Sequence, residues 1–169
     1  RLGGDPKSWQ QAPGRASAPP APPPVPAYGL GAGSAHRARA DPSVRHFDLA
    51  GFRLGSGAAL PPGATLAYKV HGPPIGEGKG VILHPTSFDA VHDELEYNIG
   101  PGRTLDTDGH SVVVANLLGN GVSYSPSTDV VRATANGSRA AGGRLAPPTL
   151  ISVADNVRAQ RALLRSLGV

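Results

Sequence analysis

Residues 99–126 constrain the fold more than any other part of this 169-residue chain. A Gly/Pro turn at 100–102 and an Asp-rich turn at 106–109 lead into the apolar triplet Val112–Val114, and an Asn/Gly/Ser loop at 116–127 follows. A short, continuously apolar segment between turn signals is typical of a strand that is buried on both faces of a sheet. We therefore predict a central strand with a polar loop at its carboxyl end.

The segments before this run predict three more strands. Residues 46–54 and 64–70 each alternate between apolar and polar side chains, and the Gly/Pro-rich turn between them favours an antiparallel pair. The triplet Val81–Leu83 is a second continuously apolar segment, which we also expect to be buried on both faces. Residues 84–98 are polar with little periodicity, so we expect a functional loop with one helical turn near its end.

The clearest helix of the chain begins after Ser152, which can cap the helix together with Asp155. Gly168 is a typical helix stop. One apolar stripe is predicted at Val153, Val157, Leu164 and Leu167, with Leu163 beside it. Two buried strands followed by a crossover helix imply an α/β fold, with a mostly parallel sheet and antiparallel edge strands.

The amino-terminal residues 1–45 differ in composition from the rest of the chain. Pro, Ala, Gly and Arg dominate, and large apolar residues are scarce, so this segment cannot offset the entropy cost of its own ordering. We predict a disordered or targeting leader at 1–45 and an incomplete folded domain at 46–169. A basic leader of this kind could be a transit peptide, which leaves a cytoplasmic or an organellar location open.

Charge and composition exclude several functions. The leader holds six basic and two acidic residues, which accounts for the whole net charge of +4. No aromatic residues are interleaved with the basic ones, so we predict no nucleic-acid surface. The chain has no cysteine, which excludes disulfides and thiolate chemistry, and it has no apolar run long enough to span a membrane.

The polar loop after Val81–Leu83 could be taken for a metal site. Its candidate ligands are His84, His92, Asp93, Glu94 and Glu96. Their spacing matches no compact ligand motif, so we expect a solvated acidic loop and no bound metal. Asp106–Gly109 lacks the length and closing Glu of a calcium loop, and Gly76–Gly80 lacks the spacing of a phosphate-binding loop.

The loop after Val112–Val114 allows two interpretations. Asn116, Gly119, Asn120 and Gly121 follow a buried strand, which is where an open α/β sheet places its ligand contacts. The same residues are also ordinary turn formers, and both interpretations remain open at this point.

Five short motifs, in one order, resemble the homoserine O-acetyltransferase family of the α/β-hydrolase fold, and its hydrolase-like branch in particular. The resemblance covers residues 64–169, the amino-terminal portion of such a protein. The motifs are Leu83-His84-Pro85-Thr86, Ile99-Gly100-Pro101-Gly102-Arg103, Asn116-Leu117-Leu118-Gly119-Asn120-Gly121, Ser125-Pro126-Ser127 and Ala154-Asp155-Asn156-Val157-Arg158-Ala159-Gln160.

The resemblance implies transfer of an acyl group from acetyl-CoA to the hydroxyl of homoserine, a step of methionine biosynthesis, through a Ser-His-Asp triad. The nucleophile of this family lies in a Gly-x-Ser-x-Gly elbow after the crossover helix, and no such pentapeptide occurs here. We therefore assign no triad residue and expect the chain to end before the elbow. The implied ligands are a small-molecule substrate and acetyl-CoA as co-substrate, with no other cofactor, and a complete protein could form a homodimer.

One catalytic part is expected within the chain. The oxyanion hole of this fold takes one backbone N–H from the loop after the third strand, and by position that donor is Thr86, with Ser87 as the alternative. The expected substrate-pocket residues are His84, Asn116, Gly119, Asn120 and Gly121.

Two other functions stay open. An ester hydrolase of the same fold would use water in place of the hydroxyl acceptor, and the motifs at 84–86 and 119–121 favour it. A non-catalytic fragment or binding protein is the alternative of a different class. We predict that the isolated chain is inactive on p-nitrophenyl acetate and unfolds without a cooperative transition.

Overall fold

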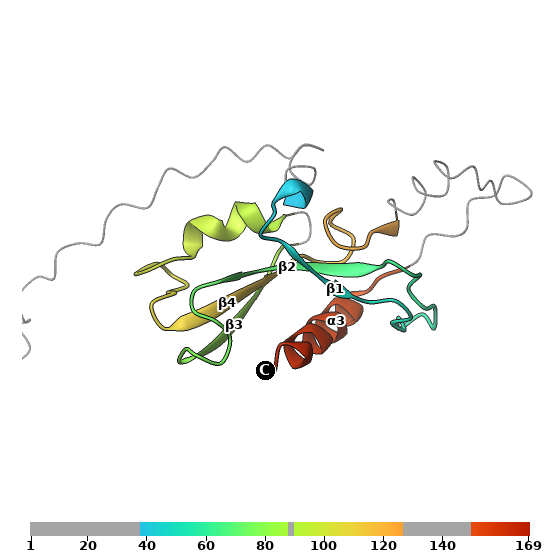
Figure 1. Cartoon of the computed structure of the whole chain (residues 1–169). Coiled ribbons are helices and arrows are strands. Elements are labelled where there is room, and N and C mark those ends of the chain that lie inside the picture. Colours follow the sequence, from blue (N-terminus) through green and yellow to red (C-terminus); the bar gives the residue numbers. More distant parts are fainter. Residues whose placement is uncertain (1–37, 88–89, 127–149) are drawn as a thin grey trace, which may run out of the picture.

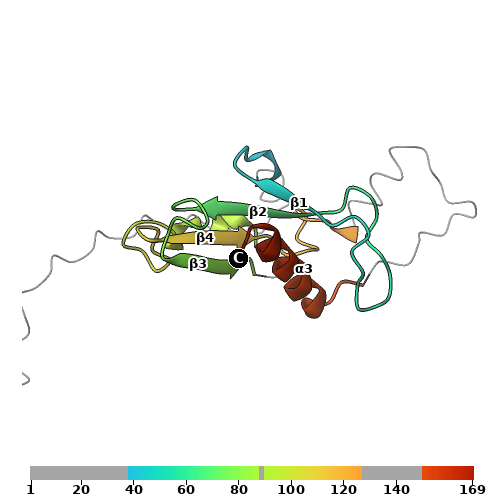
Figure 2. The same cartoon turned by 60° about the horizontal axis from the view of Figure 1, so that its bottom comes forward.

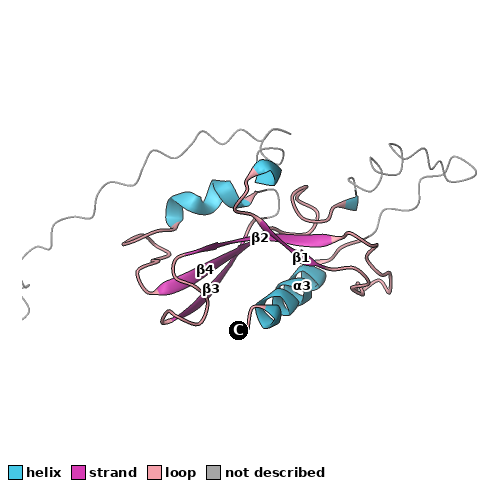
Figure 3. Ribbon diagram, in the orientation of Figure 1, coloured by secondary structure: helices cyan, strands magenta, loops and turns pink. Residues whose placement is uncertain are grey.

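A computed structural model of the chain describes residues 38–87, 90–126 and 150–169 (Figure 1). One mixed sheet is packed between two helices that lie on its opposite faces (Figures 2 and 3). Its strands are β1 (Arg45–Asp48), β2 (Thr65–His71), β3 (Gly80–Pro85) and β4 (His110–Ala115), in the order β1-β2-β4-β3. The 14-residue helix α3 (Val153–Ser166) covers one face, and the 3₁₀ helix η2 (His92–Asn98) lies over the other.

The strand pairing confirms the predicted α/β architecture with antiparallel strands at one edge. β1 pairs antiparallel with β2, and β2 pairs antiparallel with β4. β4 and β3 are parallel, with Pro85 opposite Ala115 at their carboxyl ends. The loops that follow these two strands therefore leave the sheet at the same edge, which is where an open α/β sheet binds its ligands.

The prediction for the two apolar triplets is confirmed for one and wrong for the other. Val112–Val114 of β4 is fully buried, because β4 has a strand on each side and a helix over each face. Val81–Leu83 of β3 is only half-buried. β3 is the outermost strand of the described sheet, so its side chains have neighbours on one flank only.

Helix α3 has the predicted cap but not the predicted apolar stripe. Ser152 and Asp155 form a capping box, in which each side chain accepts a hydrogen bond from the backbone N–H of the other. Val153 and Val157 are 78% and 57% exposed, whereas Leu163 is fully buried. The amino-terminal part of the predicted stripe is wrong, whereas Leu167 packs against the core. The cap and the polar contacts of α3 with neighbouring loops set which face the helix buries, and apolar periodicity alone does not.

Residues 38–45 belong to the packed part of the chain, although the sequence placed them in the leader. Ala38 is buried against Val91 and Val122, and Arg45 is the first residue of β1. The composition of this segment hides its role, because its fixed position depends on ion pairs and on one small apolar side chain. The disorder predicted for residues 1–37 lies outside the described residues.

Candidate functional site

The candidate site consists of the two loops that follow the parallel strands, residues 86–91 after β3 and residues 116–126 after β4. Thr86 joins them at the sheet edge. Its N–H donates to the carbonyl of Ala115 at 3.0 Å, and its Oγ1 accepts a hydrogen bond from the N–H of Leu117 at 3.1 Å. Thr86 is 4% exposed, so these bonds lie away from water and tie the two loops firmly together.

This arrangement bears on the two backbone donors expected from the sequence, Thr86 and Ser87. The Thr86 N–H is already engaged with Ala115, because the parallel ladder continues one residue beyond β3, so it cannot also donate to a substrate oxygen. The N–H of Ser87, the alternative donor, has no acceptor within the part of the chain that the structure describes. Ser87 is exposed at the start of the loop, and among the described loop residues 86, 87, 90 and 91 its N–H is the one without a protein acceptor.

Asn116 lies at the centre of the two loops and is fully buried. Its Oδ1 accepts hydrogen bonds from the N–H of His92 at 3.1 Å and from Nδ2 of Asn120 at 3.2 Å. Its Nδ2 lies 3.3 Å from the carbonyl oxygen of Ala67 and 3.2 Å from Nδ1 of His92. All four hydrogen-bonding positions of the amide are thus used within the protein.

The rest of the loop after β4 is held by its own backbone and side chains. Oδ1 of Asn120 accepts the N–H groups of Val122 at 3.0 Å and Ser123 at 3.2 Å, which is a local turn. Its Nδ2 donates to the carbonyl of Ala90 at 3.1 Å. Gly119 and Gly121 adopt φ values of +98° and +86°, which favour glycine. Of the two interpretations left open above, the structure supports loop formation.

His84 stands apart from this network. It lies on β3 opposite Val114 and, by strand alternation, on the same sheet face as η2. Its Nε2 is buried and has no hydrogen-bond partner among the described residues. The structure therefore places four predicted pocket residues in one loop and His84 beside it on the neighbouring strand.

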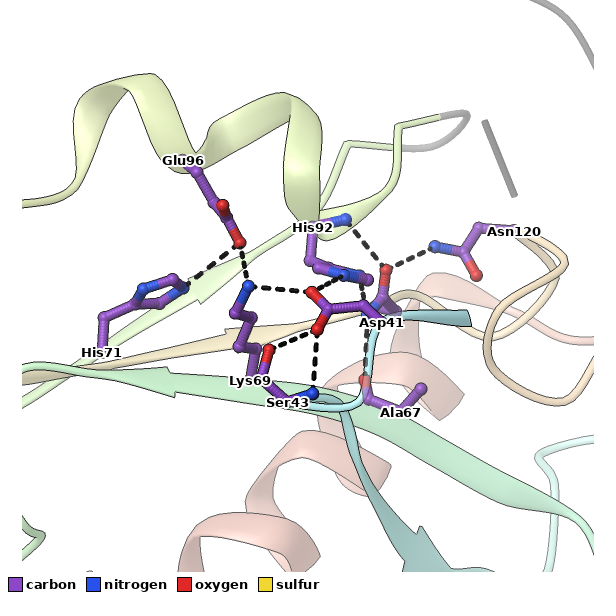
Figure 4. Close-up of polar contacts among 9 residues, drawn as sticks. Asp41, Ser43, Ala67, Lys69, His71, His92, Glu96 and Asn120 are labelled. Carbon is purple, nitrogen blue, oxygen red and sulfur yellow. Dashed lines mark hydrogen bonds and ion pairs between the residues drawn. The ribbon is translucent and has the colours of Figure 1, made fainter. Parts of the chain in front are cut away.

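A cluster of charged side chains beneath η2 was not predicted from the sequence (Figure 4). Nζ of Lys69 lies 2.9 Å from Oδ2 of Asp41 and 2.5 Å from Oε1 of Glu96. Nε2 of His71 lies 3.8 Å from the same Glu96 oxygen, and Nε2 of His92 lies 3.4 Å from Oδ2 of Asp41. The cluster connects the 38–44 segment, β2 and η2 on one face of the sheet.

Burial and hydrogen bonding set the charge states in this cluster. Hydrogen bonds from Ser43 and Lys69 hold the pKa of Asp41 well below its usual range. Burial alone would lower the pKa of Lys69, but its hydrogen bonds to Glu96 and Asp41 outweigh burial and raise it. Burial lowers the pKa of His71, so that ring is neutral at pH 7. Lys69 is thus a cation between two carboxylates.

Two properties of the described residues bear on the kind of site. None of their helices is long and apolar enough to cross a bilayer. No group of three or more His, Asp or Glu side chains among them is arranged to hold a metal ion.

Comparison with known proteins defines the class. The chain is 34% identical over 106 residues to the ethyl acetate hydrolase of Pseudomonas veronii, and 35% identical over 104 residues to the homoserine O-acetyltransferase of Deinococcus radiodurans. These alignments cover 61% and 62% of this chain but only 27% and 28% of the two relatives. No protein-family profile matches the chain.

A solved structure supports the same assignment. The acetyl esterase MekB superimposes with a TM-score of 0.55 at 30% sequence identity, over 72% of this chain and 32% of that one. The fold and the aligned sequences together define an α/β-hydrolase. The chain is similar in sequence to homoserine O-acetyltransferases and to acetyl ester hydrolases of this fold, and it spans about a third of their length.

Proposed function

We propose that this chain supplies the amino-terminal part of a serine acyltransferase of the homoserine O-acetyltransferase type, including one half of its oxyanion hole. The observation that carries the proposal is the free N–H of Ser87, on a loop fixed at the carboxyl ends of the parallel strands β3 and β4. The relatives named above supply the reaction class, transfer or hydrolysis of an acetyl ester.

In the proposed reaction a serine oxygen bonds to the carbonyl carbon of acetyl-CoA, and the carbonyl oxygen becomes an oxyanion. The Ser87 N–H donates to that oxyanion. When the carbonyl re-forms, the bond between carbon and sulfur breaks, and the CoA thiolate accepts the proton that was taken from the serine. CoA leaves as the thiol, and the acetyl group stays on the serine as an ester. The hydroxyl of homoserine then attacks the ester, and the proposed products are O-acetylhomoserine and the free serine. No serine, histidine or aspartate of this chain is assigned to the triad.

Ester hydrolysis is the second candidate, and the ethyl acetate hydrolase and acetyl esterase relatives favour it. Water would replace homoserine in the second step. The test uses the protein expressed from its complete reading frame, incubated with acetyl-CoA in the presence and absence of homoserine. CoA release that depends on homoserine supports transfer, release of acetate from ethyl acetate supports hydrolysis, and neither activity refutes both.

The role of Ser87 is tested separately with a pair of variants. Ser87→Pro removes the donating N–H, and Ser87→Ala keeps it while removing the hydroxyl. Loss of one oxyanion donor lowers kcat by about 10²–10³-fold, so we expect that loss in S87P and near-normal turnover in S87A. Equal turnover in the two variants would assign the oxyanion donor elsewhere.

The surrounding biology is part of the same proposal. We expect a small-molecule substrate, acetyl-CoA as co-substrate, a role in methionine biosynthesis and a cytoplasmic or organellar location, with homodimer formation open to direct measurement. The alternative of another class, a non-catalytic fragment or binding protein, predicts that the 169-residue chain releases no p-nitrophenol from p-nitrophenyl acetate. Turnover by the purified 169-residue chain would remove that alternative.

A further inference from the structure

The loop after β4 holds the loop after β3 at three points. The N–H of Leu117 donates to Oγ1 of Thr86, Nδ2 of Asn120 donates to the carbonyl of Ala90, and Oδ1 of Asn116 accepts from the N–H of His92. These three contacts span residues 86–92, and the free N–H of Ser87 lies within that span. The position of the proposed oxyanion donor is therefore set by the neighbouring loop.

Of these contacts, the one made by Asn116 fixes the orientation of its side-chain amide completely. The His92 N–H requires an oxygen at Oδ1, and the Ala67 carbonyl requires a nitrogen at Nδ2, so the amide fits in one orientation only. Because Nδ2 is a donor, Nδ1 of His92 must accept, and the proton of the neutral ring lies on Nε2. That nitrogen faces Oδ2 of Asp41 at 3.4 Å, which favours the same tautomer (Figure 4).

We propose that Asn116 is a positioning residue for the oxyanion loop, acting through His92. The effect on catalysis rests on the proposed function. The restraint of His92 by Asn116 does not depend on it. Asn116 grips both the backbone N–H and the ring of His92, at the end of the loop opposite Thr86. Thr86, next to Ser87, is held by its bond to Leu117, and we propose that the grip on His92 adds to this restraint on the direction of the Ser87 N–H. An oxyanion donor is effective only when its direction is fixed in advance.

Asn116→Ala removes both contacts with His92 and leaves the two other contacts between the loops in place. The matched control is Asn156→Ala. Asn156 is also a buried asparagine, 8% exposed, and its Oδ1 accepts from the N–H of Leu118 at 2.7 Å, so it supports the same loop after β4 without touching residues 86–92. Both variants are expected to lose stability, and only N116A should loosen the oxyanion loop.

Two measurements on the protein expressed from its complete reading frame separate these roles. In amide hydrogen exchange, N116A should speed exchange at His92 at least tenfold more than at β4, and N156A should change both equally. In steady-state assays of acetyl transfer or ester hydrolysis, N116A should lower kcat by about 10–100-fold with KM within about twofold, and N156A should keep kcat within about threefold.

A third readout is independent of activity. Nitrogen-15 chemical shifts of the His92 ring should show an unprotonated Nδ1 in the wild type. In Asn116→Asp a carboxylate oxygen replaces Nδ2, so Nδ1 must carry a proton to contact it, and its shift should change accordingly. A protonated Nδ1 in the wild type would overturn the proposed orientation of Asn116.

The outcomes distinguish this inference from the proposed function. If the wild type shows neither transfer nor hydrolysis, the proposed function fails, while exchange and ring shifts still test the grip of Asn116 on the loop. If the wild type is active and N116A matches N156A in kcat and in His92 exchange, the positioning role is refuted and the proposed function stands.

Discussion

Asp155 offers the strongest test of how helix α3 is fixed to the sheet. Its carboxylate is 1% exposed and accepts hydrogen bonds from the N–H of Ser152 at 2.9 Å, from Oγ of Ser152 at 2.7 Å and from the N–H of Gly55 at 2.8 Å. The guanidinium of Arg158 also contacts it. One side chain thus caps the helix and joins it to a loop 100 residues earlier in the chain.

We expect Asp155→Ala to lower the free energy of unfolding by about 3 kcal/mol. The change leaves two backbone N–H groups without their acceptor, at about 1–3 kcal/mol each, and removes the hydrogen bond from Oγ of Ser152, at about 1 kcal/mol, while Ser152 still accepts the N–H of residue 155. These terms overlap, and water can reach part of the site, so the expected value lies below their sum. Urea denaturation followed by circular dichroism measures it. Asp106→Asn is the control, because Asp106 accepts two backbone N–H groups in an exposed turn and should lose much less.

The pH dependence of this effect has a definite sign. Burial alone would raise the pKa of Asp155, but hydrogen bonds from Ser152 and Gly55 and the contact with Arg158 hold it well below its usual range. A carboxyl group whose pKa is lowered by folding stabilises the protein above its unfolded pKa, near 4, and loses that contribution as the pH falls. The gap between wild type and D155A should therefore be full at pH 6 and shrink below about pH 4. A loss under 1 kcal/mol at pH 6, or a gap that widens on acidification, would refute this account of the helix anchor.

Four further predictions follow from packing, charge and backbone geometry. Leu163→Ala should cost about 2–5 kcal/mol in thermal unfolding, while Val157→Ala at an exposed position of α3 should stay within about 0.5 kcal/mol; the reverse order would restore Val157 to the apolar stripe predicted from sequence. Lys69→Met leaves the carboxylates of Asp41 and Glu96 without their shared ammonium partner and should cost about 2 kcal/mol in urea titrations at pH 7, whereas Lys69→Arg, which keeps the cation, should cost less; equal losses would contradict this role. Gly72→Ala should cost roughly 2 kcal/mol or more by the same titration, because φ is +85° and the new Cβ would lie 2.4 Å from the carbonyl oxygen of His110. Thr86→Val should cost about 1–3 kcal/mol and Thr86→Ser almost nothing, since only the hydroxyl accepts the bond that joins the two loops; equal losses in calorimetry would contradict this role.

The four strands and the antiparallel pairing of β1 with β2 could be predicted from the sequence because they depend on local patterns, whereas the pairing of β2 with β4 was not predicted. Continuous apolar triplets marked β3 and β4, alternation marked β1 and β2, and Ser152 with Asp155 marked the start of α3. These signals lie within a few residues of one another along the chain. Each reflects a property of the backbone itself, namely the two-residue period of a strand or the unpaired N–H groups of a helix end.

The rotation of α3 and the packing of residues 38–45 could not be predicted in this way. The face that α3 buries is set by Asp155, Asn156 and Gln160, whose polar side chains would ordinarily be assigned to solvent. Two of them contact loops far away in the chain, at Gly55 and at Leu118. Asp41 is likewise held in the folded part of the chain by its ion pair with Lys69 on β2. The composition of residues 38–45 does not predict that ion pair.

In the candidate site, too, local patterns predict the strands that carry the loops, whereas contacts between residues distant in the chain fix the shape of the loops. The contacts that join the two loops link residues 24, 30 and 31 positions apart, so no local motif encodes them. They are nevertheless specific, because a buried amide with four satisfied positions cannot shift without breaking several bonds at once. A loop held in this way does not reorganise when charge develops on a substrate oxygen, which is the property that makes a backbone N–H an effective oxyanion donor. On the proposed function, the Asn/Gly motif of this chain supports the oxyanion loop, and its side chains need not touch the substrate to affect turnover.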